Sequence, residues 1–182
     1  MWNIAGQFGS SQRPGTPREK RGETPMAVKA TKFDHVAITV SDTQKSLDFY
    51  VGKLGLRQVE QHALEGDKVD EANGLQGARA QSTRLIAPES TDVLIDLLEY
   101  WDHEQQNHVT HHGSVGSCHF ALVVDDLPAA VEELQNDGVE FISGPVNFEL
   151  TEGSVSVCFC YDPDGNLVEL MEEYVQYPGA DD

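Results

Sequence analysis

Long apolar runs, paired cysteines and basic charge are all scarce in this chain of 182 residues. No apolar stretch approaches the ~20 residues that a membrane-spanning helix needs. The N-terminus also lacks the apolar core of a signal peptide. The three cysteines, Cys118, Cys158 and Cys160, are an odd number without framework spacing. This argues against a disulfide scaffold and predicts a protein of the reducing cytoplasm.

Basic residues are outnumbered: 12 lysines and arginines stand against 31 aspartates and glutamates, for a net charge of −19. Binding to phosphate backbones or anionic membranes requires clustered basic side chains. We therefore expect neither nucleic acid nor a membrane as a partner. Anionic carriers such as coenzyme A and glutathione are disfavoured by the same balance, so a small neutral substrate is expected.

Composition and hydrophobic period divide the chain into five segments. We expect a flexible leader at 1–30, a module at 31–101, a His-rich linker at 102–116, a second module at 117–174 and a tail at 175–182.

What the sequence does contain is an internal repeat. The segment from His35 to Asp42 matches the segment from His119 to Asp126 at a constant offset, and Leu94-Ile-Asp-Leu-Leu-Glu99 resembles Leu167-Val-Glu-Leu-Met-Glu172. A repeat of this kind indicates two copies of one structural unit.

Each copy is predicted to fold as βαβββ, which places the chain in the α+β class. Strands are expected at 33–40, 56–64, 78–86 and 93–100 in the first copy, and at 117–124, 139–142, 154–161 and 166–172 in the second. Helices are expected at 43–54 and 127–137, and residues 65–77 are expected to form a loop.

Strand parity shows which side chains meet, because successive side chains point to opposite faces. His35 shares a face with Ala37 and Thr39, while the bulky apolar residues between them take the other face. His119 likewise shares a face with Ala121. The histidines therefore lie on faces with room for a cavity.

Asp96 and Glu169 occupy equivalent repeat positions, each flanked on its own face by apolar residues. A lone carboxylate in such surroundings is costly unless it is paired or binds a metal. Glu99 and Glu172 fall on the opposite faces, where solvent exposure is expected. Two histidines and two carboxylates at matched positions predict a metal site, for which Zn, Fe, Mn, Co and Ni are all suitable ions.

The chain resembles the vicinal-oxygen-chelate superfamily, which includes glyoxalase I, methylmalonyl-CoA epimerase, extradiol dioxygenases and bleomycin-resistance proteins. The resemblance runs from about residue 32 to 173. It is carried by Phe33–Val40, by Ser46–Tyr50 with Leu54-Gly-Leu56, by Cys118–Asp125, and by Asp162–Leu170.

The resemblance implies paired βαβββ modules that form a cupped mixed sheet around a divalent metal. The implied ligands are His35, Asp96, His119 and Glu169. Asp96 departs from the pattern, because glyoxalase-like members have Glu there and epimerase-like members have Gln. Glu99 remains the alternative third ligand after a register shift.

The same resemblance implies the chemistry. The expected enzyme is an epimerase or isomerase that chelates two vicinal oxygens of a small hydroxyketone, of sugar or cyclitol type, and moves an α-proton through an enediolate. Glu169 is the leading catalytic base and Asp96 the complementary group. The residues expected to contact substrate are Thr39, Leu98, Trp101 and Met171.

Other readings stay open at this point. A glyoxalase-like lyase, a ring-cleaving dioxygenase and a non-catalytic, ligand-sequestering protein all fit the same superfamily. The linker histidines, among them His108 and His112, form either a second metal site or a solvated loop at the cavity mouth. A homodimer is expected, with the site either within one chain or between two.

Overall fold

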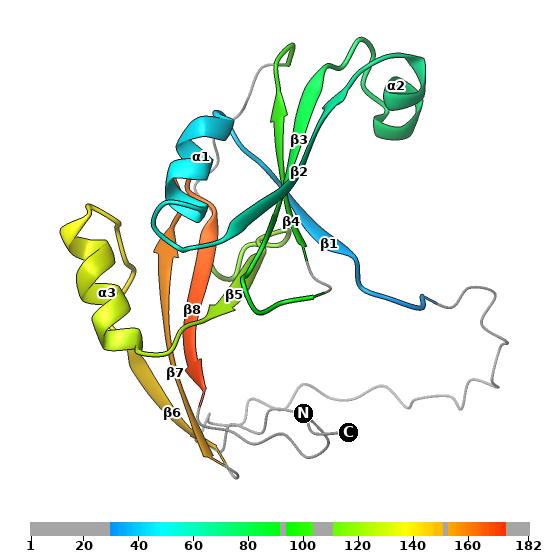
Figure 1. Cartoon of the computed structure of the whole chain (residues 1–182). Helices are drawn as coiled ribbons and strands as arrows, with labels where there is room; N and C mark the ends of the chain where they lie inside the picture. Colours follow the sequence, from blue (N-terminus) through cyan, green and yellow to red (C-terminus); the bar gives the residue numbers. More distant parts are fainter. Residues whose placement is uncertain (1–29, 92–93, 104–110, 151–152, 174–182) are drawn as a thin grey trace, which may run out of the picture.

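The structure is a computed structural model that describes residues 30–91, 94–103, 111–150 and 153–173 (Figure 1). Residues 1–29 of the expected leader, the expected tail and His108 therefore lie outside the described residues. The first half contains β1 (His35–Thr39), α1 (Thr43–Tyr50), β2 (Arg57–Leu64), α2 (Asp67–Asn73), β3 (Ala80–Ile86) and β4 (Leu94–Tyr100). The second half contains β5 (His119–Val123), α3 (Leu127–Asn136), β6 (Val146–Leu150), β7 (Gly153–Tyr161) and β8 (Leu167–Glu173).

The strands form two four-stranded mixed sheets with the same topology. Their orders are β1-β4-β3-β2 and β5-β8-β7-β6. In each sheet the first strand pairs in parallel with the last, and the remaining pairs are antiparallel. The βαβββ repeat and the α+β class are thus confirmed, and the two sheets are separate within the described residues. No helix in the described ranges is long and apolar enough to cross a membrane.

Two elements differ from expectation. The segment predicted as a loop contains α2, a short helix with acidic residues in its first turn and no buried side chain. Without a buried face it carries no hydrophobic period, so the sequence pattern could not reveal it. The strand predicted at 139–142 is reduced to one bridge between Phe141 and Cys160. Regular pairing with β7 begins only at β6, after Pro145.

Both main helices begin at aspartates of the repeat. The Asp42 carboxylate accepts hydrogen bonds from the backbone N–H groups of Gln44 and Lys45, and Asp126 accepts from that of Ala129. These bonds satisfy N–H groups that have no partner inside the helix. The helix starts therefore follow from the sequence, and each helix is fixed at the end of the strand that bears a candidate histidine.

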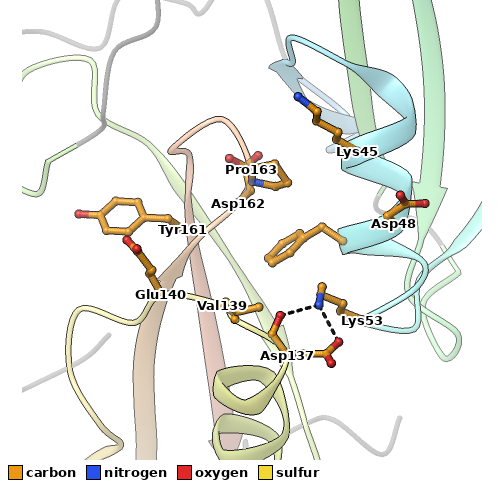
Figure 2. A pocket seen from close by; sticks show the side chains of 11 residues that line it. Lys45, Asp48, Lys53, Asp137, Val139, Glu140, Tyr161, Asp162 and Pro163 are labelled. Atoms are coloured by element: carbon orange, nitrogen blue, oxygen red, sulfur yellow. Dashed lines mark hydrogen bonds and ion pairs between the residues drawn. The ribbon is translucent and has the colours of Figure 1, made fainter.

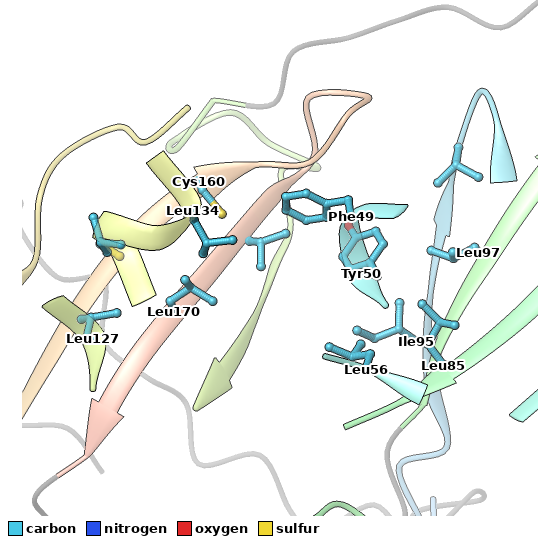
Figure 3. Packing of buried hydrophobic residues seen from close by; sticks show 14 residues of the cluster. Phe49, Tyr50, Leu56, Leu85, Ile95, Leu97, Leu127, Leu134, Cys160 and Leu170 are labelled. Atoms are coloured by element: carbon cyan, nitrogen blue, oxygen red, sulfur yellow. The ribbon is translucent and has the colours of Figure 1, made fainter. Parts of the chain in front are cut away.

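One apolar core joins the two halves, and it lies between the sheets (Figure 3). Phe49, Tyr50 and Leu97 from the first half belong to the same buried cluster as Leu134 and Leu170 from the second. Ile95 and Leu97 alternate with Asp96 along β4, as Val168 and Leu170 alternate with Glu169 along β8. We call the core side of each sheet its helix face and the side bearing Asp96 or Glu169 its open face. The shared core turns both open faces away from each other.

Polar contacts hold the two halves together beside this core. The buried Tyr50 hydroxyl donates to Asp162 Oδ2 over 2.8 Å, and Lys53 Nζ lies 2.6 Å from Asp137 Oδ2. A cavity of about 490 Å³ opens at this seam, lined by α1, the end of α3 and the β7–β8 turn (Figure 2). None of the candidate metal ligands lines it.

Candidate metal centre

The second sheet presents a histidine and a carboxylate in contact. His119 Nε2 lies 3.2 Å from Glu169 Oε2 on the open face. Glu169 is partly buried, and burial raises the pKa of its carboxyl above the usual range, an effect that the nearby His119 and His112 partly offset. An imidazole nitrogen and a carboxylate oxygen this close supply two adjacent donors for a divalent ion. We call this pair the second half-site.

The first sheet repeats the backbone register of these two residues. His35 pairs with Leu94 and Ala37 with Asp96, just as His119 pairs with Leu167 and Ala121 with Glu169. His35 Nδ1 is 2.9 Å from Asp34 Oδ2, and this hydrogen bond lowers the pKa of Asp34. A carboxylate on one ring nitrogen orients the other toward a metal. His35 and Asp96 form the first half-site.

Asp96 has closer neighbours than Glu169. Ser82 Oγ donates to Asp96 Oδ1 over 2.6 Å, and Arg84 Nε lies 3.6 Å from Asp96 Oδ2. Asp96 is only 5% exposed although it belongs to the open face. These neighbours from β3 explain how a carboxylate can be buried there, because each oxygen has a polar partner.

The four sequence-predicted ligands do not meet in one chain. Within the described residues, which include all four, no group of three or more His, Cys, Asp or Glu side chains is placed to hold a metal. The reason is the shared core, which directs the two open faces apart. Each chain therefore carries two half-sites with two donors each, a separation that strand parity alone does not reveal.

Glu99 and Glu172 were expected to be solvent-exposed, and that expectation is wrong. Glu99 Oε2 accepts from the backbone N–H of Thr43 at 2.9 Å and from its hydroxyl at 2.6 Å. Glu172 Oε2 accepts from the backbone N–H of Leu127 at 2.9 Å. Both carboxylates thus bind the first turn of a helix from the neighbouring strand. Glu99 and Glu172 occupy equivalent positions in the repeat, and this was the sequence signal that could have revealed their shared role. Glu99 lies on the helix face, away from His35.

The residues expected to contact substrate are divided between the sheets. Thr39 and Leu98 pair in register on the first open face, beside Asp96. Met171 lies beside Glu169 in a cavity of about 430 Å³ on the second open face. Trp101 follows β4, is 47% exposed and does not line this cavity.

An apolar wall surrounds Glu169, and its residues are not among the site residues predicted from the sequence. Its members come from the neighbouring strands β6 and β7 and line the same cavity as Met171: Phe148, Leu150, Val155, Val157 and Phe159. The alternation of apolar with other residues along β6 and β7 was the sequence signal that could have revealed this wall. The first open face instead carries the charged groups of Arg84, Glu60 and Asp96.

One linker histidine reaches the second half-site. The ring of His112 lies 4.5 Å from that of Phe159 and 5.7 Å from that of His119, measured between centroids. It is solvent-exposed. The position of His112 agrees with the prediction that the linker histidines belong to a solvated loop at the mouth of the cavity.

Two βαβββ modules, each with a four-stranded mixed sheet, define the class of fold to which the chain belongs. The profile of the Glyoxalase/Bleomycin resistance protein/Dioxygenase superfamily matches residues 32–170, and the chain belongs to this family.

Curated relatives share this extent. A lactoylglutathione lyase of Pseudomonas aeruginosa is 28% identical over 173 residues, covering 91% of this chain and 93% of the relative. A lactoylglutathione lyase of Escherichia coli O157:H7 is 29% identical over 141 residues, covering 76% and 90%.

Solved structures agree on the fold. A glyoxalase family protein from Bacillus cereus aligns with a TM-score of 0.71 at 21% identity, covering 81% of this chain and 97% of that one. The trypanothione-dependent glyoxalase I of Leishmania major aligns with a TM-score of 0.54 at 20% identity, covering 79% and 88%.

Proposed function

We propose that the chain is a divalent-metal-dependent enzyme that moves a proton next to a carbonyl, and that its metal centre forms between two copies. The observation that carries this proposal is the identical register of two half-sites, each with one imidazole and one carboxylate on an open face. Two donors are too few for a stable divalent site, whereas four from two half-sites are sufficient.

The second open face supports a partner chain. Val123, Val146 and Phe148 on this face are 65%, 44% and 38% exposed. A contiguous apolar surface beside polar ligands is characteristic of an interface or a ligand site. In a symmetric dimer the first open face of one copy covers the second open face of the other, which forms two complete sites and buries this surface.

The residues have distinct roles in this proposal. His35 and His119 hold the ion, together with Asp96 and Glu169. When bound there, a divalent ion would supply Lewis-acid stabilisation to two vicinal oxygens of the substrate and so make the neighbouring C–H more acidic. Glu169 accepts that proton, because it lies in the apolar wall where burial strengthens its basicity. The wall excludes water and receives the apolar part of the substrate.

Two reactions use this machinery. In a glyoxalase-like lyase the proton returns to the neighbouring carbon of a thiol hemithioacetal, and the names of the curated relatives favour testing this first. In an epimerase or isomerase the proton returns to the other face of the same carbon or to a neighbouring one in a hydroxyketone. Glu169 serves as the base in both.

The test combines metal analysis with turnover. The purified chain should contain about one divalent ion per polypeptide, as two sites per dimer require. It should also exchange substrate α-protons for solvent deuterium. The panel consists of the methylglyoxal–glutathione hemithioacetal, the same adduct of a neutral thiol, and dihydroxyacetone. Glu169→Gln should lose exchange at least 100-fold, while Glu132→Gln, on the exposed side of α3, should retain it.

Several outcomes would contradict the proposal. Stoichiometric metal with O₂ consumption and no exchange would indicate a dioxygenase. Tight ligand binding without metal would indicate a sequestering protein. Exchange that survives in both His35→Ala and His119→Ala would remove the metal from the mechanism.

A further inference from the structure

Among the residues that the structure describes, Arg84 is the arginine or lysine that lies against a candidate metal ligand. It lies on β3 directly opposite Asp96 on β4, and on its other side it faces Glu60 on β2. Its Nε is 3.6 Å from Asp96 Oδ2 and its Nη1 is 3.5 Å from Glu60 Oε2. A divalent ion bound at the first half-site therefore approaches a carboxylate that already has a cation beside it.

The two oxygens of Asp96 have different neighbours. Oδ1 accepts from the Ser82 hydroxyl at 2.6 Å, and Oδ2 is the oxygen nearest to Arg84. The Asp96 side chain is 7% exposed and the Arg84 side chain is 31% exposed, so the carboxylate is largely shielded from water whereas the arginine side chain is only partly shielded. Arg84 Nε is itself buried and makes no hydrogen bond within the described part of the chain. The guanidinium thus has a buried nitrogen 3.6 Å from the oxygen that a metal needs.

Glu169 has no such neighbour at the equivalent position. The residue opposite it on β7 is Phe159, and its ion-pair contact is with His119, the other half of the same half-site. The two carboxylates share one register but differ in charge environment. Asp96 also has one methylene fewer than Glu169, which restricts its reach beyond Ser82 and Arg84.

We propose that Arg84 is a positioning residue that competes with the metal for Asp96, so that Asp96 binds the ion through Oδ2 alone and as its weakest protein ligand. Ser82 keeps Oδ1 within the sheet. Arg84 withdraws charge from Oδ2 and turns toward Glu60 when the ion binds. This inference rests on the proposed metal centre.

The experiment measures Co²⁺ affinity and the Co²⁺ absorption spectrum of the full chain, neither of which depends on turnover. Arg84→Met should raise the Co²⁺ affinity roughly tenfold or more, because it removes a positive charge within ~4 Å of a ligand oxygen. Ser82→Ala should raise it less. Arg84→Lys, which retains the charge, should stay within about threefold of the unmodified chain. The matched control is Arg79→Met, because Arg79 pairs with Asp102 instead.

A double substitution shows whether the effect passes through Asp96. In an Asp96→Asn background, Arg84→Met should raise the affinity by threefold or less, because the contested oxygen is no longer charged. Arg84→Met with Ser82→Ala should also change the Co²⁺ spectrum toward higher coordination, since both oxygens of Asp96 then become free.

Each result has a definite meaning. An unchanged or lower affinity in Arg84→Met, with normal binding by the unmodified chain, would overturn the inference and leave the metal centre standing. An equal gain in Co²⁺ affinity in the Asp96→Asn background would also overturn it, because Arg84 would then repel the ion by its charge and not through Asp96. No Co²⁺ binding by the unmodified chain would overturn the metal centre itself, and the inference with it. Thermal unfolding with a chelator present verifies that each variant is folded.

Discussion

At the residue scale, one buried contact links the two halves. Tyr50 is fully buried and donates to Asp162, whose side chain also accepts from the backbone N–H groups of Asp164 and Asn166. Asp162 begins the tight turn that ends with Gly165 at a φ of 83°. A carboxylate with several donors fixes both the turn and the position of α1 against it. The pattern Asp-Pro-Asp-Gly predicted the turn but not its partner from the other half.

The contact between Tyr50 and Asp162 makes the free energy of unfolding depend on pH in the alkaline range. Burial and the nearby Asp162 raise the pKa of the Tyr50 hydroxyl well above 10 in the folded chain. The unfolded chain releases this proton near pH 10, so the free energy of unfolding should fall as the pH rises above that value. Tyr50→Phe should cost about 1 kcal/mol at pH 7 and flatten this decline. Urea unfolding between pH 7 and 11 measures both, and an unchanged slope would contradict the assignment.

The cysteines provide a second residue-scale prediction. Burial raises the pKa of Cys158 to about 11 and that of Cys160 to about 12, whereas Cys118 is exposed. The thiolate is the reactive form, so the two buried thiols should stay unmodified below about pH 10. Iodoacetamide at pH 8 should label only Cys118 in the folded chain and all three in denaturant. Rapid labelling of Cys160 would show that the second sheet is not packed as described.

At the element scale, each sheet holds its helix through a glutamate on the last strand. Glu99 on β4 and Glu172 on β8 bind the first turns of α1 and α3, where the helix dipole also favours negative charge. Carboxylates three residues apart on the same strand thus have different roles in both copies of the repeat. Those at 96 and 169 lie on the open faces, and those at 99 and 172 fix the helices.

Glu99→Ala and Glu172→Ala should each destabilise the chain by about 1 kcal/mol, because each removes a hydrogen bond to a helix N-terminus. Metal uptake should be unaffected, because neither residue lies on an open face. Glu132→Ala on the exposed side of α3 is the control and should change stability by less than about 0.5 kcal/mol. Loss of metal in Glu99→Ala alone would restore Glu99 as the third ligand.

The elements show what the sequence could and could not predict. Strands such as β1 and β8 and the starts of both main helices follow from alternation and from the capping aspartates. The short helix α2 has no buried face and left no periodic signal. The ligand positions follow from the repeat, but the roles of Ser82 and Arg84 arise from cross-strand pairing, whose register a single strand does not reveal.

At the scale of the whole molecule, the arrangement of the two halves determines whether the two half-sites of one chain can meet. The helix faces form one core, and the two half-sites consequently point away from each other. Local patterns determine which face a side chain takes but not how two modules are oriented. The exposed apolar residues of the second open face and the incomplete donor sets are both accounted for if a second copy completes each site.

The most direct test of this claim is complementation between two inactive variants. His35→Ala lacks the first half-site and His119→Ala lacks the second, so neither homodimer has a complete centre. When equal amounts are unfolded together and refolded, half of the random dimers are mixed, and each mixed dimer has one intact centre of its two. The account predicts that about a quarter of the original metal-binding capacity and turnover returns. No recovery beyond that of the separate variants, in dimers shown to have exchanged chains, would contradict a centre shared between two copies.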